Sequence, residues 1–139
     1  MDFTFSKDER LSGLKNFENL TKHGNSFFSH PFRITWMIAP LNAENGEQPY
    51  PVKIAFGVPK RNFKQAVKRN RIKRLFREAY RKHKHELYSA LELKSVKITA
   101  MCIYTAKEVP SHSEAEGKII LSLRRLLNAV DGAGKRPEA

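Results

Sequence analysis

Arginine and lysine dominate one stretch of the chain, and the chemistry they offer is the binding of anions. Residues 60–84 hold twelve Lys or Arg and a single acid, Glu78, so this segment carries +11 of a total net charge of +12. The rest of the chain is close to neutral. A generally basic, solubilising surface would spread its charge, so this concentration predicts a polyanionic ligand such as nucleic acid.

The other side chains offer little for bond chemistry. A metal-dependent nuclease needs paired carboxylates, or histidines close enough to share a ligand or a proton. Of the fourteen acids none forms an Asp-x-Asp pair near the basic segment, and Glu9 lies in the N-terminal arm. His83 and His85 fall about 200° apart on a helix, and Cys102 is expected to be an inert core thiol. We therefore expect no catalytic residue, and a protein-only metal nuclease is the weakest alternative.

The elements that must position the basic segment follow from hydrophobic periodicity. Apolar residues at three-residue steps predict a helix over Leu11–Lys22. Aromatic and β-branched residues predict a strand over Phe27–Pro40, with a further short strand near Phe27 as an option. Leu41–Pro51 is a loop, and Val52–Val58 alternates as a half-buried strand does. Because the two long strands are neighbours in the chain, we expect them to form an antiparallel pair.

The second half of the chain continues the alternation of helix and strand. A period of 3.6 predicts a helix from Phe63 to Leu87, and Val96–Tyr104 is typical of a strand buried on both faces. Ser111 and Ser113 each precede an acid by three residues, which suggests capping boxes for a final helix. Gly132 is expected to end that helix. The whole is an α+β sandwich of helices on a small sheet.

Length and composition set the wider frame. A chain of 139 residues with 40% hydrophobic residues is expected to form one domain, over residues 1–130, with 131–139 as a flexible C-terminal tail. No apolar run approaches the ~20 residues that span a bilayer, and the N-terminus lacks an apolar signal core. We expect a cytoplasmic protein that does not enter a membrane.

The basic helix has two distinct faces. With Ile72 taken as zero, the apolar residues fall between about −60° and +40°. A solvated charged face would mix signs, and a membrane-surface or calmodulin-target helix would need its apolar face free. Here the apolar face is committed to the core, so the outward stripe is expected to meet phosphates. That outward stripe comprises Asn70, Lys73, Arg74, Arg77, Arg81 and Lys84.

One segment of this helix has a position-specific pattern. Residues 66–78 read A-x-x-R-N-R-I-K-R-x-x-R-E, which resembles the RNR signature of the bacterial ribonuclease P protein subunit family. The resemblance extends to a first helix at Leu14–Gly24 and to a strand leading into the signature at Lys53–Arg61. Val96–Lys107 and Ser113–Val130 resemble the closing strand and helix, so most of the chain is covered.

The resemblance implies a particular fold. Members of the family are α-β-β-β-α-β-α two-layer sandwiches, similar to domain 2 of ribosomal protein S5. Their crossover through the basic helix is left-handed. The general rule for such crossovers predicts the opposite hand. The expected handedness therefore comes from the resemblance alone.

The resemblance also implies partners and roles. The family protein binds the catalytic RNA of ribonuclease P, and a cleft beside its first helix takes the 5′ leader of precursor tRNA. The RNA, with Mg²⁺ as cofactor, hydrolyses the bond between leader and tRNA. This chain would then be an accessory subunit, with one protein bound to each RNA. No DNA partner is expected. The RNA-facing set implied here is Lys60, Arg61, Lys64, Lys68, Arg69, Asn70, Arg71, Lys73, Arg74, Arg77 and Arg81. The implied leader-cleft residues are Phe17, Phe32 and Phe56, and no metal ligand is assigned.

Two departures and one alternative remain. Thr21 stands where family members often have a second Phe, and loop 41–51 looks longer than usual. Phe17 also fits a plain core position of an amphipathic helix. From another class, a non-enzymatic RNA-binding protein of the ribosomal type would share the basic helix, but it would not need Phe17 or a leader-sized groove.

Overall fold

A computed structural model describes residues 4–39 and 49–135 of the chain. Most of the predicted loop 41–51 and the end of the predicted tail lie outside the described residues. The elements follow the expected order, with an added 3₁₀ turn and a split second helix. They are η1 Lys7–Glu9, α1 Leu14–His23, β1 Asn25–Ser29, β2 Phe32–Ile38, β3 Val52–Gly57, α2 Ala66–His83, α3 His85–Leu93, β4 Ile98–Tyr104 and α4 His112–Lys135.

Four strands of the described chain form one mixed sheet in the order β1-β2-β4-β3. The optional short strand near Phe27 is present as β1, which pairs antiparallel with β2. The expected pairing of β2 with β3 is wrong, because β4 lies between them, antiparallel to β2 and parallel to β3. β4 is the most continuously apolar strand. A strand between two others buries more of its surface than an edge strand does, which favours this central position for β4. α2 and α3 form the β3-to-β4 crossover, and its hand stays a prediction.

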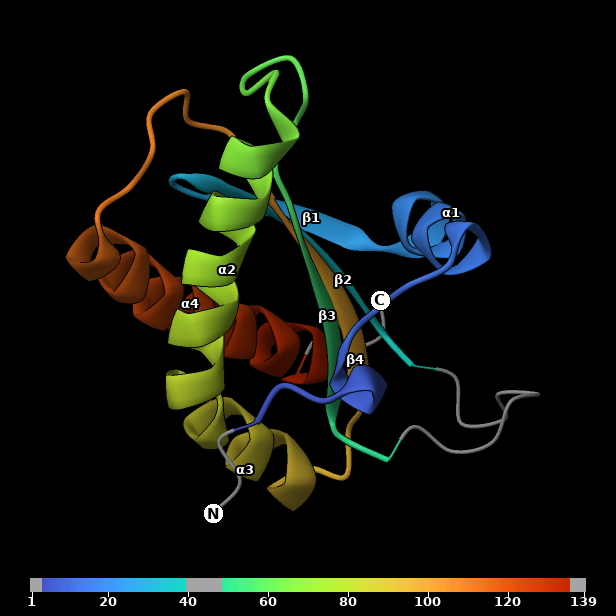
Figure 1. Cartoon of the computed structure of the whole chain (residues 1–139). Coiled ribbons are helices and arrows are strands. Elements are labelled where there is room, and N and C mark those ends of the chain that lie inside the picture. Colours follow the sequence, from blue (N-terminus) through green and yellow to red (C-terminus); the bar gives the residue numbers. More distant parts are fainter. Residues whose placement is uncertain (1–3, 40–48, 136–139) are drawn as a thin grey trace.

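One face of the sheet carries the hydrophobic core. α2 and α4 cover this face, whereas α1 lies on the other side (Figure 1). Alternate strand residues such as Ile34, Ile54 and Ala100 are fully buried there. Phe76 of α2 packs edge-on against Phe32, with ring centroids 4.7 Å apart. This packing fixes α2 with its other face outward.

The opposite face of the sheet is only partly covered. Along β4, Thr99, Met101 and Ile103 are half-exposed while the intervening residues are buried, so the prediction of a strand buried on both faces is wrong. Among the described helices, only α1 packs on this face, and it is short and contacts mainly β2. β3 is the edge strand of the sheet on this side, and most residues of α1 are exposed.

The helix ends differ in detail from the sequence-based boundaries. The helix expected from Phe63 to Leu87 begins at Ala66 and is divided at Lys84 into α2 and α3. The capping box at Ser111 is confirmed, because its Oγ accepts from the Glu114 N–H and its own N–H donates to the Glu114 carboxylate, each at 3.1 Å. α4 runs through Gly132 to Lys135, beyond the predicted end. The predicted end of this helix at Gly132 is therefore wrong, whereas the division into a domain of residues 1–130 and a tail stays a prediction.

Candidate nucleic-acid interface

α2 presents a polar face that is almost wholly cationic. Its buried residues, Ile72, Phe76, Ala79 and Tyr80, hold the helix on the core. The outward orientation expected for the basic stripe is confirmed at five of its six positions, where the side chains are exposed or half-exposed, while their contact with RNA stays a prediction. The accessible polar residues of α2 are Lys68, Arg69, Asn70, Arg71, Lys73, Arg74, Arg77, Glu78, Arg81, Lys82 and His83.

Lys84 is the exception, and its predicted outward position is wrong. Lys84 is 1% exposed at the junction of α2 and α3. Its ammonium donates to the carboxylate of Glu9 and to the carbonyl of Thr4. Regular helix geometry alone put Lys84 on the outward stripe, but the N-terminal arm packs over the end of that stripe and buries it.

The single acid of α2 does little to neutralise this face. Glu78 accepts from Arg81 Nη2 at 2.7 Å, and this hydrogen bond lowers the pKa of Glu78 below its ordinary value. Both side chains are partly exposed, and such i,i+3 pairs contribute about 0.2–1 kcal/mol. The pair removes one positive charge from the balance and leaves the remainder of the face unopposed.

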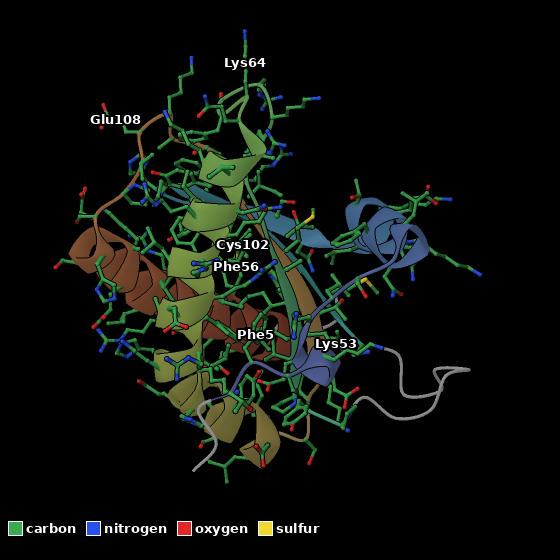
Figure 2. All side chains as sticks on the ribbon, in the orientation of Figure 1. Phe5, Lys53, Phe56, Lys64, Cys102 and Glu108 are labelled. Carbon is green, nitrogen blue, oxygen red and sulfur yellow. The ribbon has the colours of Figure 1, made fainter. Side chains whose placement is uncertain are left out.

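The turn before α2 adds more cations at the same end of the molecule. Lys60, Arg61 and Lys64 are exposed there, and Lys64 projects from the tip of the molecule in Figure 2. Arg69 reaches back from α2, where its Nη1 donates to the carbonyls of Phe63 at 2.8 Å and Lys64 at 2.9 Å. Arg69 therefore fixes the turn as well as contributing charge.

A surface cavity of about 510 Å³ lies beside this turn. Three lysines line it, Lys64, Lys68 and Lys107, and one acid, Glu108, which lies at the same end of the molecule as Lys64 (Figure 2). The cavity is open, and its three lysines extend the cationic surface of α2 to the loop after β4.

A second hollow, of about 290 Å³, runs along the outer edge of β3, and we call it the edge groove. Phe17 of α1 forms one wall and is half-exposed, while Lys73 and Arg77 of α2 form the facing wall. No acidic residue lines the groove among the described residues. An aromatic wall facing cations suits a nucleotide, whose base stacks while its phosphate pairs with charge. The full lining is Phe5, Arg10, Leu11, Ser12, Phe17, Ile54, Ala55, Phe56, Lys73 and Arg77.

The three aromatic residues assigned to the leader cleft are not brought together. Phe32 is fully buried on the core face against Phe76 and Tyr104, so its assignment to the cleft is wrong. Phe56 is 5% exposed and packs on Phe76 and Tyr80, yet it also closes the floor of the edge groove. Of the three, only Phe17 presents a ring that is half-exposed.

The N-terminal arm brings a residue that sequence reasoning missed. Glu9 is fully buried and accepts hydrogen bonds from Lys84 Nζ and, at 2.6 Å, from the Tyr88 hydroxyl. Burial raises the pKa of Glu9, but hydrogen bonds from Lys84, Tyr88 and the Ser6 backbone outweigh it and hold the pKa below its ordinary value. Burial also raises the pKa of Tyr88, which therefore remains a donor. The contact spans 75 residues of chain, and no local pattern announces it.

The described residues contain no cluster of three His, Cys, Asp or Glu side chains able to hold a metal ion. Cys102 is buried in β4, and burial raises the pKa of its thiol to about 12. None of the helices described is long and apolar enough to cross a membrane. The cationic face of α2 and the edge groove are suited to binding anions and flat apolar groups.

Fold and site together define a class: a small α+β protein with a helical cationic face and an adjoining aromatic groove, as in proteins that bind RNA. Comparison with known proteins narrows this class. The family model described as Ribonuclease P matches residues 5–116. The ribonuclease P protein component of Porphyromonas gingivalis is 31% identical over 136 residues, which cover 98% of this chain and 96% of the relative. The chain belongs to the ribonuclease P protein family.

Solved structures agree with the fold. The RNase P protein of Thermotoga maritima superposes with a TM-score of 0.63 at 20% identity, covering 84% of this chain and 96% of that one. The Staphylococcus aureus RNase P protein gives a TM-score of 0.56 at 21% identity, covering 88% and 94%. The predicted α+β sandwich is confirmed by these similarities.

Proposed function

We propose that the chain is the protein subunit of a bacterial ribonuclease P that binds two RNAs at once. α2 would bind the catalytic RNA, and the edge groove would take the single-stranded 5′ leader of precursor tRNA. In this proposal the RNA, with Mg²⁺ that it holds itself, hydrolyses the phosphodiester bond, and the chain supplies no catalytic group. One protein assists each RNA, in the cytoplasm.

The adjacency of the cationic face and the edge groove carries this proposal. Lys73 and Arg77 belong to both, so a strand in the groove lies beside whatever polyanion covers α2. Cations placed between two RNA strands lower the repulsion that would otherwise keep them apart. A ribosomal-type binder needs only α2, and the groove with Phe17 would then have no ligand.

Stacking explains how a leader of any sequence could be held. Every base has a flat face, and stacking on an aromatic ring contributes about 1–3 kcal/mol per base with little sequence preference. The groove contacts only the precursor, because mature tRNA has no leader. The expected result is a higher affinity for precursor than for mature tRNA.

Reconstitution tests the proposal. The purified protein, the catalytic RNA and a 5′-labelled precursor tRNA are combined at low Mg²⁺, and leader removal is followed with either component omitted. Cleavage that needs both components supports the accessory-subunit role. Tight RNA binding without any stimulation of cleavage would favour the ribosomal-type alternative. Cleavage by the protein alone would contradict the absence of catalytic groups.

A further inference from the structure

The N-terminal arm, residues Thr4–Ser12, forms a third wall of the edge groove. Leu11 donates its N–H to the Ile54 carbonyl at 3.1 Å, and Arg10 forms an isolated parallel bridge with Ile54. The arm thereby lies along the outer edge of β3, between α1 and α2. It brings residues into the groove that the RNR pattern does not include.

Arg10 is the cation that this arm contributes. Its side chain is exposed, and it lines the groove together with Lys73 and Arg77. Its guanidinium carbon lies 5.8 Å from the centre of the Phe5 ring, which itself packs edge-on against buried Tyr80 at 5.3 Å. A guanidinium seated on a fixed ring keeps its fork of N–H donors available for a phosphate.

The arm is held in place by a buried ion pair. Glu9, the residue before Arg10, receives Lys84 Nζ and the Tyr88 hydroxyl on one carboxylate oxygen. Its other oxygen accepts from the N–H of Ser6 at 3.1 Å, which closes the η1 turn. The arm is thus fixed by the carboxylate of Glu9 on one side of Arg10 and by the Ile54 contact on the other.

We propose that Arg10 binds a phosphate of the single-stranded leader in the edge groove, and that the Glu9–Lys84 pair is the positioning element for Arg10. This inference rests on the proposed function and adds a leader contact outside α2. The three cations surround an apolar floor that contains Phe56. A strand with its base against Phe17 therefore has phosphate partners on the arm and on α2. Arg10 therefore acts on precursor affinity and not on assembly with the catalytic RNA.

Arg10→Ala is compared with Lys7→Ala in the reconstituted holoenzyme. Lys7 is exposed on the same arm but does not line the groove. Each variant loses one positive charge, so the two differ only in whether that charge lies in the groove. Two substrates are used, one with a long leader and one with a leader of a single nucleotide. Arg10→Ala is expected to raise KM about fivefold for the long leader, the upper range for an exposed charge pair. It is expected to leave kcat and catalytic-RNA affinity unchanged, and to have no effect on the short leader.

Three outcomes would overturn the leader contact. They are equal losses on both leaders, weaker binding of the catalytic RNA by Arg10→Ala, or an equal effect of Lys7→Ala. Failure of the unaltered protein to stimulate cleavage at all would instead refute the proposed function, so the two failures are distinguishable.

The positioning role of Glu9 is tested by a double-mutant cycle. Glu9→Gln should raise KM for the long leader alone and add less than about twofold in an Arg10→Ala background, because both changes remove the same contact. Additive effects would refute positioning through Arg10. If Glu9→Gln does not fold, Tyr88→Phe replaces it, since this change removes one hydrogen bond to Glu9 and leaves the ion pair.

Discussion

Arg69 donates two hydrogen bonds backward along the chain, to the carbonyl oxygens of Phe63 and of the residue that follows it. The first arginine of the RNR pattern is therefore partly committed to holding the turn that leads into α2. The other exposed arginines of the pattern project from regular helix. Arg69 thus contributes both positive charge and hydrogen bonds that hold the turn, so its substitution should affect RNA affinity and stability.

Arg69→Ala is expected to lower both stability and RNA affinity. Loss of its two hydrogen bonds should reduce the free energy of unfolding by about 1–2 kcal/mol. Arg74→Ala is the matched control, because Arg74 is exposed on the same helix and should weaken RNA binding with little change in stability. Denaturant unfolding and RNA titration of both variants separate the two effects. Equal stability of the two variants would contradict a structural role for Arg69.

The cationic face of α2 predicts a measurable salt dependence. If about six phosphates are neutralised, log affinity for the catalytic RNA should fall with log salt at a slope of about −4 to −5. A Lys73/Arg74/Arg77 triple alanine variant should flatten this slope by about two units or more.

A triple variant elsewhere on the surface controls for net charge. Lys7, Lys118 and Arg124 lie off α2, and their replacement by alanine removes the same formal charge. This control should leave the slope within about one unit of the unaltered protein. An unchanged slope in the α2 variant would exclude that helix from the interface.

The buried pair of Glu9 and Lys84 predicts a pH-dependent stability. The pKa of Glu9 lies below its ordinary value of 4.5 in the folded protein. Its ionised form therefore adds stability that is fully present above about pH 4.5 and is lost as the pH falls through the lowered pKa. Unfolding curves across this range should show the loss in the unaltered protein and a smaller one in Glu9→Gln.

Removing one charge of the Glu9–Lys84 pair is expected to lower the free energy of unfolding more than removing both charges. Glu9→Gln leaves the ammonium of Lys84 buried without its counter-ion, which should destabilise the protein by about 3–5 kcal/mol at neutral pH. The double variant Glu9→Gln/Lys84→Met removes both charges and should recover much of that loss. A double variant as unstable as the sum of both single ones would show that the pair is not coupled.

Local sequence patterns predict the elements of this fold better than their partners. The 3.6 period of α2 and the capping box at Ser111 are local signals, and the structure reproduces both. The placement of β4 between β2 and β3 depends on which strand buries most surface in the complete sheet. The order of strands along the chain therefore did not predict which strands pair. The Glu9–Lys84 contact is equally non-local, because an acid in an N-terminal arm carries no sign of burial.

The leader-cleft assignment shows a different limit. Phe32 is two residues before Ile34, and residues two apart in a strand face the same side. This alternation directs Phe32 to the core face, where it is found, whereas the resemblance alone suggested the cleft. Phe17 was open to both interpretations because its helix is short, and its half-exposed ring in the edge groove is compatible with each.

Phe17 predicts a selective effect on the precursor. Phe17→Ala should weaken precursor tRNA binding by about 1–3 kcal/mol through loss of one stacked base, and should leave mature tRNA binding unchanged. Leu14→Ala is the control, since Leu14 is 74% exposed on the same helix and does not line the groove. Equal losses for precursor and mature tRNA would show that Phe17 serves only the packing of α1.

A substitution at Thr21 is expected to raise the affinity for precursor tRNA. It lies one turn after Phe17 on α1, is exposed, and donates its hydroxyl to the Phe17 carbonyl at 2.9 Å. Thr21→Phe would add a second ring one helical turn from the first. Precursor affinity is expected to rise by up to the value of one stacked base, about 1–3 kcal/mol, for leaders of two or more nucleotides. Thr21→Val, which removes the hydroxyl without adding a ring, should produce no gain. A gain that persists with a single-nucleotide leader would place the new ring against another part of the RNA.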